Sequence, residues 1–273
     1  MEEFIHFLQG TMEEPKVISW FHLIAVIPII IGAILIPFFF KDTSEKNYKR
    51  ILLGAWITLL ILEVFKQLIK SFHYGSPSYW EYNFKDFPFA LSSMVYYFLP
   101  IIIFFNKEKH PKIVDAAIGY MCFISLTAGI IVCTYTELAT SSLIYINVQT
   151  FIHHGSQVIL GVFIYVWNRR TISIKTFYRS LIAFAITVVI AIILNVSIYP
   201  RNIDAFFINP MVITRLPVGK IVQEKAGYPV FLIGYLSVMA LLTYLTYLAE
   251  TSIYKLIKKK KEQKTSQNSD ITL

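Results

Sequence analysis

The chain has 273 residues, of which 56% are hydrophobic and only 15% are charged, and its mean hydropathy is +0.58. A soluble domain has about 45–50% apolar and about 25% charged residues, so this composition excludes a soluble globular protein and predicts a membrane protein. The net charge of +8 comes largely from lysines and arginines that flank apolar segments, where they meet lipid headgroups. It therefore gives no reason to expect nucleic-acid binding.

Seven apolar segments are long enough to cross a bilayer, because a hydrocarbon core of about 30 Å requires roughly 20 residues of helix. In chain order they cover residues 18–40, 51–70, 87–105, 113–134, 143–167, 177–199 and 227–249. The acidic start MEEFIHFLQGTMEEP is unlike the basic start of a signal peptide, so we expect it to stay on the protein. The sequence predicts an all-α membrane protein, a bundle of about seven transmembrane helices within residues 1–257, followed by a disordered basic tail over 258–273.

The basic residues predict the orientation of this bundle. Sixteen lysines and arginines flank the spans on one side, in segments 41–50, 107–112, 169–175 and 255–264, and seven lie on the other side. Because cytoplasmic loops carry the excess of basic residues, we expect the N-terminus outside and the C-terminus in the cytoplasm of a cell membrane. Lys258 to Lys261, just after the last span, are expected to bind anionic headgroups at about 1 kcal/mol each.

Cysteines and short motifs add little chemistry. Cys122 and Cys133 lie in one predicted span, roughly 16 Å apart along a helix, which is too far for a disulfide. The sequence has no metal-ligand spacing and no glycine-rich phosphate loop, so we expect neither a metal nor another cofactor.

Polar residues inside the spans carry the functional information, because such residues are costly in lipid and turn toward other helices or a wet cavity. With the predicted orientation, the outer half and the midplane hold most of them: His22, Glu63, Lys66, Ser92, Ser93, Asn147, His153, His154 and Asn195. Each also fits a simple role in helix packing. Their shared depth predicts that Glu63, Ser92, His154 and Asn195 line one cavity, with the outer segment 200–229 covering its mouth.

Several short stretches, in this order, resemble the YwaF-type integral membrane proteins. The stretches are WFHLIAV, Glu63, FPFALSSMVYYFLP, INVQTFIHHG and LNVSIYPRNIDAFFINP. The resemblance covers nearly the whole chain. That family includes an animal relative regarded as an acyltransferase that acts on ether phospholipids, so the resemblance implies a membrane scaffold that handles lipids.

The resemblance also assigns residues, with departures. The family's third-span motif is similar to Leu-Pro-Leu-His-Leu-Cys, and its cysteine is the proposed acyl carrier. In this chain Pro88 matches the proline, whereas Ala90 and Ser92 replace the histidine and the cysteine. The family's His-Gly is matched by His154 and Gly155, and its first-span histidine by His22. Asn195 and Asn202 match an Asn followed by an Asn-Tyr segment, although Ile203 replaces the tyrosine.

A serine hydroxyl requires a positioned base, and His154 is the candidate base for Ser92, with Asn147 or Glu63 to orient it. Asn195 or backbone donors of the outer loop are candidates for holding the oxyanion. The expected substrate-binding residues are His22, Lys66, Asn147, His153, Asn195 and Asn202. Loss of the cysteine and histidine also fits a non-catalytic lipid-binding or accessory protein. A small proton-coupled transporter is a third hypothesis, against which stands the lack of repeat symmetry and of paired broken helices.

Overall fold

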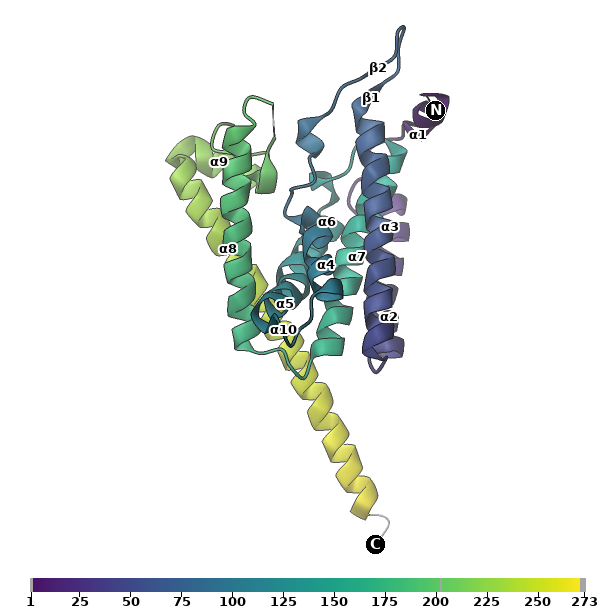
Figure 1. Cartoon of the computed structure of the whole chain (residues 1–273), viewed down its shortest axis with the longest axis vertical. Coiled ribbons are helices and arrows are strands. Elements are labelled where there is room, and N and C mark those ends of the chain that lie inside the picture. The colour runs from purple at the N-terminus through teal and green to yellow at the C-terminus, as the bar shows by residue number, and fades with distance from the viewer. Residues whose placement is uncertain (1, 202, 271–273) are drawn as a thin grey trace.

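The computed structural model describes residues 2–201 and 203–270, and it is mostly helical with almost no sheet (Figure 1). The longer helices are α2 (Trp20–Phe40), α3 (Glu45–Ser71), α4 (Val95–Phe104), α5 (Pro111–Gly119), α6 (Leu126–Thr134), α7 (Ile144–Asn168), α8 (Ile174–Ser197), α9 (Pro217–Ala226) and α10 (Tyr228–Asp270). The chain also forms a short helix, α1 (Glu2–Leu8), a hairpin of β1 (Phe72–His73) and β2 (Tyr79–Trp80), and several short 3-10 turns. The predicted helical class is confirmed.

Five helical segments of the described chain are long and apolar enough to cross a membrane, so the predicted count of seven is not confirmed. They are Trp20–Phe40, Glu45–Ser71, Pro111–Thr134, Ile174–Ser197 and Tyr228–Lys259. The expected third span gives only the shorter apolar helix Ser92–Phe104, because the chain before Ser92 is not a regular helix. The expected fifth span, α7, has 25 residues, but its amide and histidine side chains make it less apolar than the other five.

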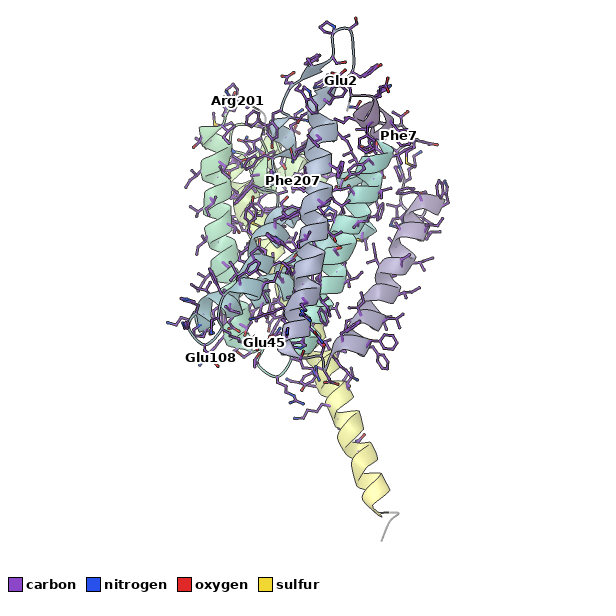
Figure 2. The ribbon with its side chains drawn as sticks, turned by 45° about the vertical axis from the view of Figure 1, so that its right-hand side comes forward. Glu2, Phe7, Glu45, Glu108, Arg201 and Phe207 are labelled. Carbon is purple, nitrogen blue, oxygen red and sulfur yellow. The ribbon has the colours of Figure 1, made fainter. Side chains whose placement is uncertain are left out.

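The two ends of the bundle carry different features. At one end, here called the hairpin end, lie α1, the β1–β2 hairpin and Arg201 (Figures 1 and 2). At the opposite end, the tail end, lie the turns at Glu45 and Glu108, and α10 projects beyond them (Figure 2). The structure gives the basic tail as a continuation of α10 to Asp270, where the sequence predicts disorder.

The helix α7 stands inside the bundle, in contact with α2, α3 and α6 (Figure 1). Two glycines permit these close approaches. A Cβ atom on Gly129 of α6 would lie 2.8 Å from the carbonyl oxygen of His154, and one on Gly155 of α7 would lie 2.5 Å from Ile29. Small residues of this kind let helix backbones approach closely where lipid gives no hydrophobic drive.

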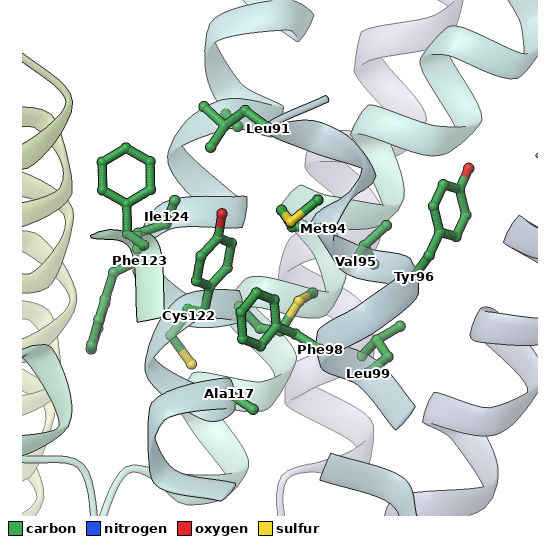
Figure 3. Close-up of a cluster of buried hydrophobic side chains, with 14 of the residues drawn as sticks. Leu91, Met94, Val95, Tyr96, Phe98, Leu99, Ala117, Cys122, Phe123 and Ile124 are labelled. Atoms are coloured by element: carbon green, nitrogen blue, oxygen red, sulfur yellow. The ribbon is translucent and has the colours of Figure 1, made fainter. Parts of the chain in front are cut away.

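The apolar core lies where α4 packs on the continuous segment Pro111–Thr134. The apolar stretch of this segment is 78% buried, whereas that of α2 is 11% buried. A π-helical turn, Tyr120–Ser125, joins α5 to α6 within this core, and all of its residues are buried. Figure 3 shows the cluster, which includes Met94, Leu99 and Phe123. Tyr96 lies at its edge with the hydroxyl turned away (Figure 3), so this core supports the side of α4 that leads to the polar residues.

Candidate functional site

A polar pocket of about 410 Å³ lies between α3, the segment 85–93, the segment 137–141, α7 and the loop that follows α8. Of the site residues predicted from the sequence, five line it: Glu63, Lys66, Ser92, His153 and His154. Asn147, His22 and Asn195 do not. The predicted site residues thus give five of the twenty residues that line the pocket, and their matched depth does not distinguish pocket residues from packing residues.

Glu63 is the centre of the hydrogen bonds on the α3 side of the pocket. Its Oε1 receives Lys66 Nζ at 2.8 Å and the Gln67 amide at 2.6 Å, while the Tyr96 hydroxyl donates to Oε2 at 3.0 Å. Glu63 is only 6% exposed. Three donors thus converge on one buried carboxyl and satisfy oxygens that would be costly to leave unpaired in lipid.

Tyr96 extends this network to α7. Its hydroxyl oxygen lies 2.9 Å from His153 Nδ1, and His153 Nε2 lies 3.2 Å from the backbone carbonyl oxygen of Ser92. The hydroxyl has one proton and two possible acceptors, Glu63 Oε2 and His153 Nδ1, so it can donate to only one of them at a time. Sequence reasoning missed Tyr96, because a tyrosine within an apolar run gives no sign of its partner.

His154 is held by a second amide contact. Its Nδ1 lies 3.1 Å from Gln157 Oε1, and Gln157 Nε2 donates to the Ser92 carbonyl oxygen at 2.5 Å. Since the Gln157 amide nitrogen faces a carbonyl, its oxygen must face His154, and this network assigns the proton of a neutral His154 to Nδ1. Within the described chain no hydrogen bond occupies His154 Nε2, so its lone pair is free to act as a base.

Three predicted site residues, His22, Asn147 and Asn195, bind backbone groups instead of lining the pocket. His22 accepts from the Ile18 amide at 3.1 Å and contacts the Cys133 carbonyl oxygen at 2.8 Å. Asn147 binds the backbone of Ser141 through both amide atoms, at 2.9 and 2.8 Å. These contacts fix the start of α2 and the turn before α7.

Asn195 is fully buried and binds both backbone groups of Ala205, at 2.7 and 3.1 Å. It therefore anchors the loop after α8, and its amide is not free to hold an oxyanion. Asn202, its predicted companion, lies outside the described residues.

The loop that Asn195 anchors, residues 203–216, contributes Phe207 and Arg215 to the pocket wall. The side-chain amide of Asn209 donates to the Ile203 carbonyl oxygen at 2.6 Å, and its backbone amide donates to Asp204 Oδ1 at 3.1 Å. Burial raises the pKa of Asp204 above its ordinary value of 3.8, while the Asn209 amide and Arg215 oppose this rise.

A second, apolar pocket of about 460 Å³ lies between α2 and α7. Its lining is almost wholly hydrocarbon and includes Phe21, Ile29, Phe151 and Ile159, with Ser156 as an exception. The α7 residues of this pocket and those of the polar pocket lie on opposite faces of the helix, so α7 separates the two.

The comparison with family models gives a match over residues 17–247, to the TMEM164 family. The chain belongs to the TMEM164 family. The matched region includes every element that lines the polar pocket, whereas the basic end of α10 lies beyond it. This membership and the apolar helices make the chain a multi-pass membrane protein. The match does not extend to the YwaF name or to the acyltransferase relative, and no curated protein and no solved structure matches the chain.

Proposed function

We propose that this TMEM164-family protein transfers or hydrolyses acyl groups of membrane lipids, with Ser92 as the nucleophile and His154 as the base. The observation that carries the proposal is the free Nε2 of His154, held in one tautomer by Gln157, in the wall of a pocket that Ser92 also lines. A hydroxyl, a base and a third group that orients the base are the parts that acyl transfer requires. The resemblance of the third-span stretch to a motif with an acyl-carrying cysteine supports the same position.

In the proposed reaction, Ser92 Oγ attacks the carbonyl carbon of a lipid ester while His154 Nε2 takes the hydroxyl proton. The tetrahedral intermediate then expels the lipid alkoxide, which receives that proton, and the acyl group stays on Ser92. An alcohol of a second lipid, or water, attacks next and gives its proton to His154, which restores Ser92.

The negative charge of the intermediate needs donors, and Asn195 is occupied elsewhere. Ser92 begins the helical segment Ser92–Phe104, whose N-terminal end favours negative charge. The side chain of Gln149, which lines the pocket, is a further donor. We assign Glu63 and Tyr96 to positioning, because they hold His153 against the Ser92 carbonyl oxygen.

The decisive measurement is acyl transfer by the purified protein in vesicles that contain a fluorescent phospholipid ester. We expect Ser92→Ala to abolish turnover and to remove an acyl adduct detectable on the intact protein by mass spectrometry. Ser93→Ala is the matched control, because Ser93 lies next in the chain and lines the same pocket. Unchanged turnover in Ser92→Ala would show that Ser92 is not the nucleophile.

A non-catalytic lipid-binding protein is the alternative, and one observation favours it. Across residues 2–201 and 203–270, no hydrogen bond joins the Ser92 hydroxyl to His154, so a substrate would have to bring the two into contact. Under this alternative His154→Ala weakens lipid binding, whereas wild-type and Ser92→Ala proteins both show no turnover. A proton-coupled transporter would instead use the Glu63, Tyr96 and His153 path, and proton uptake into vesicles would detect it.

We also propose the finer topology: seven spans, including Ser92–Phe104 and α7, with the hairpin end outside the cell membrane. The excess of basic residues at the tail end supports it. The lysines from Lys258 onward would then contact anionic headgroups of the cytoplasmic leaflet. A reporter fused after Leu273 should be active only in the cytoplasm, and activity only outside would reverse the orientation.

A further inference from the structure

Basic side chains from distant parts of the chain meet at the polar pocket. Its lining contains four of them, Lys66, Lys70, Lys85 and Arg215. Lys66 is paired with Glu63 at 2.8 Å, whereas no carboxylate of the described residues lies within ion-pair distance of the other three. The remaining acids of the lining are Asp86 and Glu137, and Asp86 Oδ2 already accepts from the Asn83 amide at 2.7 Å.

This convergence is specific, because basic residues are scarce at the hairpin end. The segments at that end hold only seven: Lys16, Lys70, Lys85, Arg201, Arg215, Lys220 and Lys225. Three of the seven line one pocket, from α3, from the turn at residues 84–86 and from the 203–216 loop. We propose that Lys70, Lys85 and Arg215 bind an anionic group of the phosphate class at the entrance of the polar pocket.

The pocket wall also has polar groups without an internal partner. Gln149 is only 5% exposed and lines the pocket, and its side-chain amide makes no hydrogen bond with any described residue. A buried amide is normally hydrogen-bonded, because burying it unpaired is costly. Its free donor and acceptor are therefore available to a ligand that the cations attract.

The backbone that delivers Arg215 is held in an unfavourable conformation. Phe206 and Phe207 have φ angles of 58° and 60°, in the left-handed region that side chains other than glycine rarely adopt. Side-chain contacts to the backbone enforce it: Asn195 binds Ala205, and Thr214 donates to the Phe207 carbonyl oxygen at 3.0 Å. Such strain persists where the surroundings impose a geometry, and it is common at ligand-binding sites.

A phosphate group suits this site, because two lysines act as point charges and an arginine can bind two of its oxygens at once. The phosphate can belong to a lipid headgroup or be a free anion in water. The anion site is related to the proposed reaction by its location, since the anion would share the pocket with Ser92. It does not require that reaction, and it is testable without turnover.

The test uses the full-length protein with Ser92→Ala, purified in a neutral detergent, so that no ester is consumed. Binding of dihexanoyl phosphatidic acid is measured by calorimetry and compared with dihexanoylglycerol, which has the same chains and no phosphate. We expect phosphatidic acid to bind at least about tenfold more tightly, and Arg215→Gln or Lys85→Gln to remove about tenfold of that affinity. Arg215→Lys should lose less, and added salt should weaken binding because the charges are near water.

Lys220→Gln is the matched control, because Lys220 lies at the same end in α9 and does not line the pocket. Competition by sodium phosphate would identify a site for the free anion as well, and failure to compete would assign the site to the lipid-borne group. Equal affinity for the two lipids, or no response to the Lys70, Lys85 and Arg215 substitutions, would overturn the proposal. Binding that depends on Arg215, together with no turnover by the wild-type protein, would retain the anion site and reject the acyl-transfer proposal.

Discussion

The anchoring of the 203–216 loop by Asn195 permits a quantitative prediction. Asn195→Ala removes the partners of both backbone groups of Ala205, which are buried with it. Each unsatisfied buried group costs about 1–3 kcal/mol, so the closed loop should lose about 2–6 kcal/mol. The left-handed backbone of Phe206 and Phe207 adds to the effect, because its strain is relieved when the loop opens.

The assay is hydrogen exchange of the loop peptide, followed through the amides of Ala205, Ile208 and Asn209, which are hydrogen-bonded in the closed loop. A loss of 2 kcal/mol corresponds to roughly 30-fold faster exchange. Asn195→Asp keeps the acceptor for the Ala205 amide and should lie between the extremes. Val196→Ala, at a half-exposed neighbouring position, should change nothing. Unchanged loop exchange together with lost turnover would refute the anchoring role and return Asn195 to the substrate.

Three further predictions concern packing, orientation and charge. Gly129→Ala should lower the free energy of unfolding by about 1–3 kcal/mol, because its Cβ would lie 2.8 Å from the His154 carbonyl oxygen. Gly54→Ala is the control, because its Cβ would have no atom within 4 Å, and it should be neutral or slightly stabilising. If turnover is found, Gln157→Leu should reduce it by roughly 100-fold through loss of the His154 tautomer, and Gln157→Glu, which keeps the acceptor, should lose less; equal losses would reject orientation as the cause. Burial raises the pKa of Asp204, so the folded loop binds its proton more tightly than the unfolded chain. Its contribution to stability is full below the ordinary pKa of 3.8 and is lost as pH rises through the raised value, and a melting curve of Asp204→Asn should lack this dependence.

The sequence predicts the helices well because apolar run length is a local property. It predicts less about which polar residues meet. Depth groups Glu63, Ser92 and His154 with Asn195. The first three line one pocket, and Asn195 does not. His22 and Asn147 have the same depth, yet their partners are backbone groups of Cys133 and Ser141. Depth follows from position along a span, whereas the choice between pocket and backbone depends on tertiary contacts that no periodicity encodes.

The third span shows the same limit for length. Residues 87–105 are apolar enough to be expected as one helix, but helical structure begins only at Ser92, as a 3-10 turn that leads into α4 at Val95. Pro88 disfavours a helical conformation in the residue before it. The non-helical start places the Ser92 carbonyl oxygen within reach of Gln157 and His153 from α7. The deviation from a regular span is thus what joins α4 to the polar face of α7.

The cost of that polar face argues for a function beyond packing. A buried ionic network is often no more stabilising than well-packed apolar residues of similar volume, and in a membrane apolar residues cost nothing to insert. Glu63 and Lys66 satisfy each other, so that pair alone is explicable as structure. His154 Nε2 and the Gln149 amide face the pocket with no hydrogen bond from any described residue, and a purely structural network gains nothing from leaving them free. Polar groups that line the pocket without a partner in the described chain are available to a ligand that completes their hydrogen bonds, and the binding and turnover experiments ask which ligand it is and whether the protein transforms it.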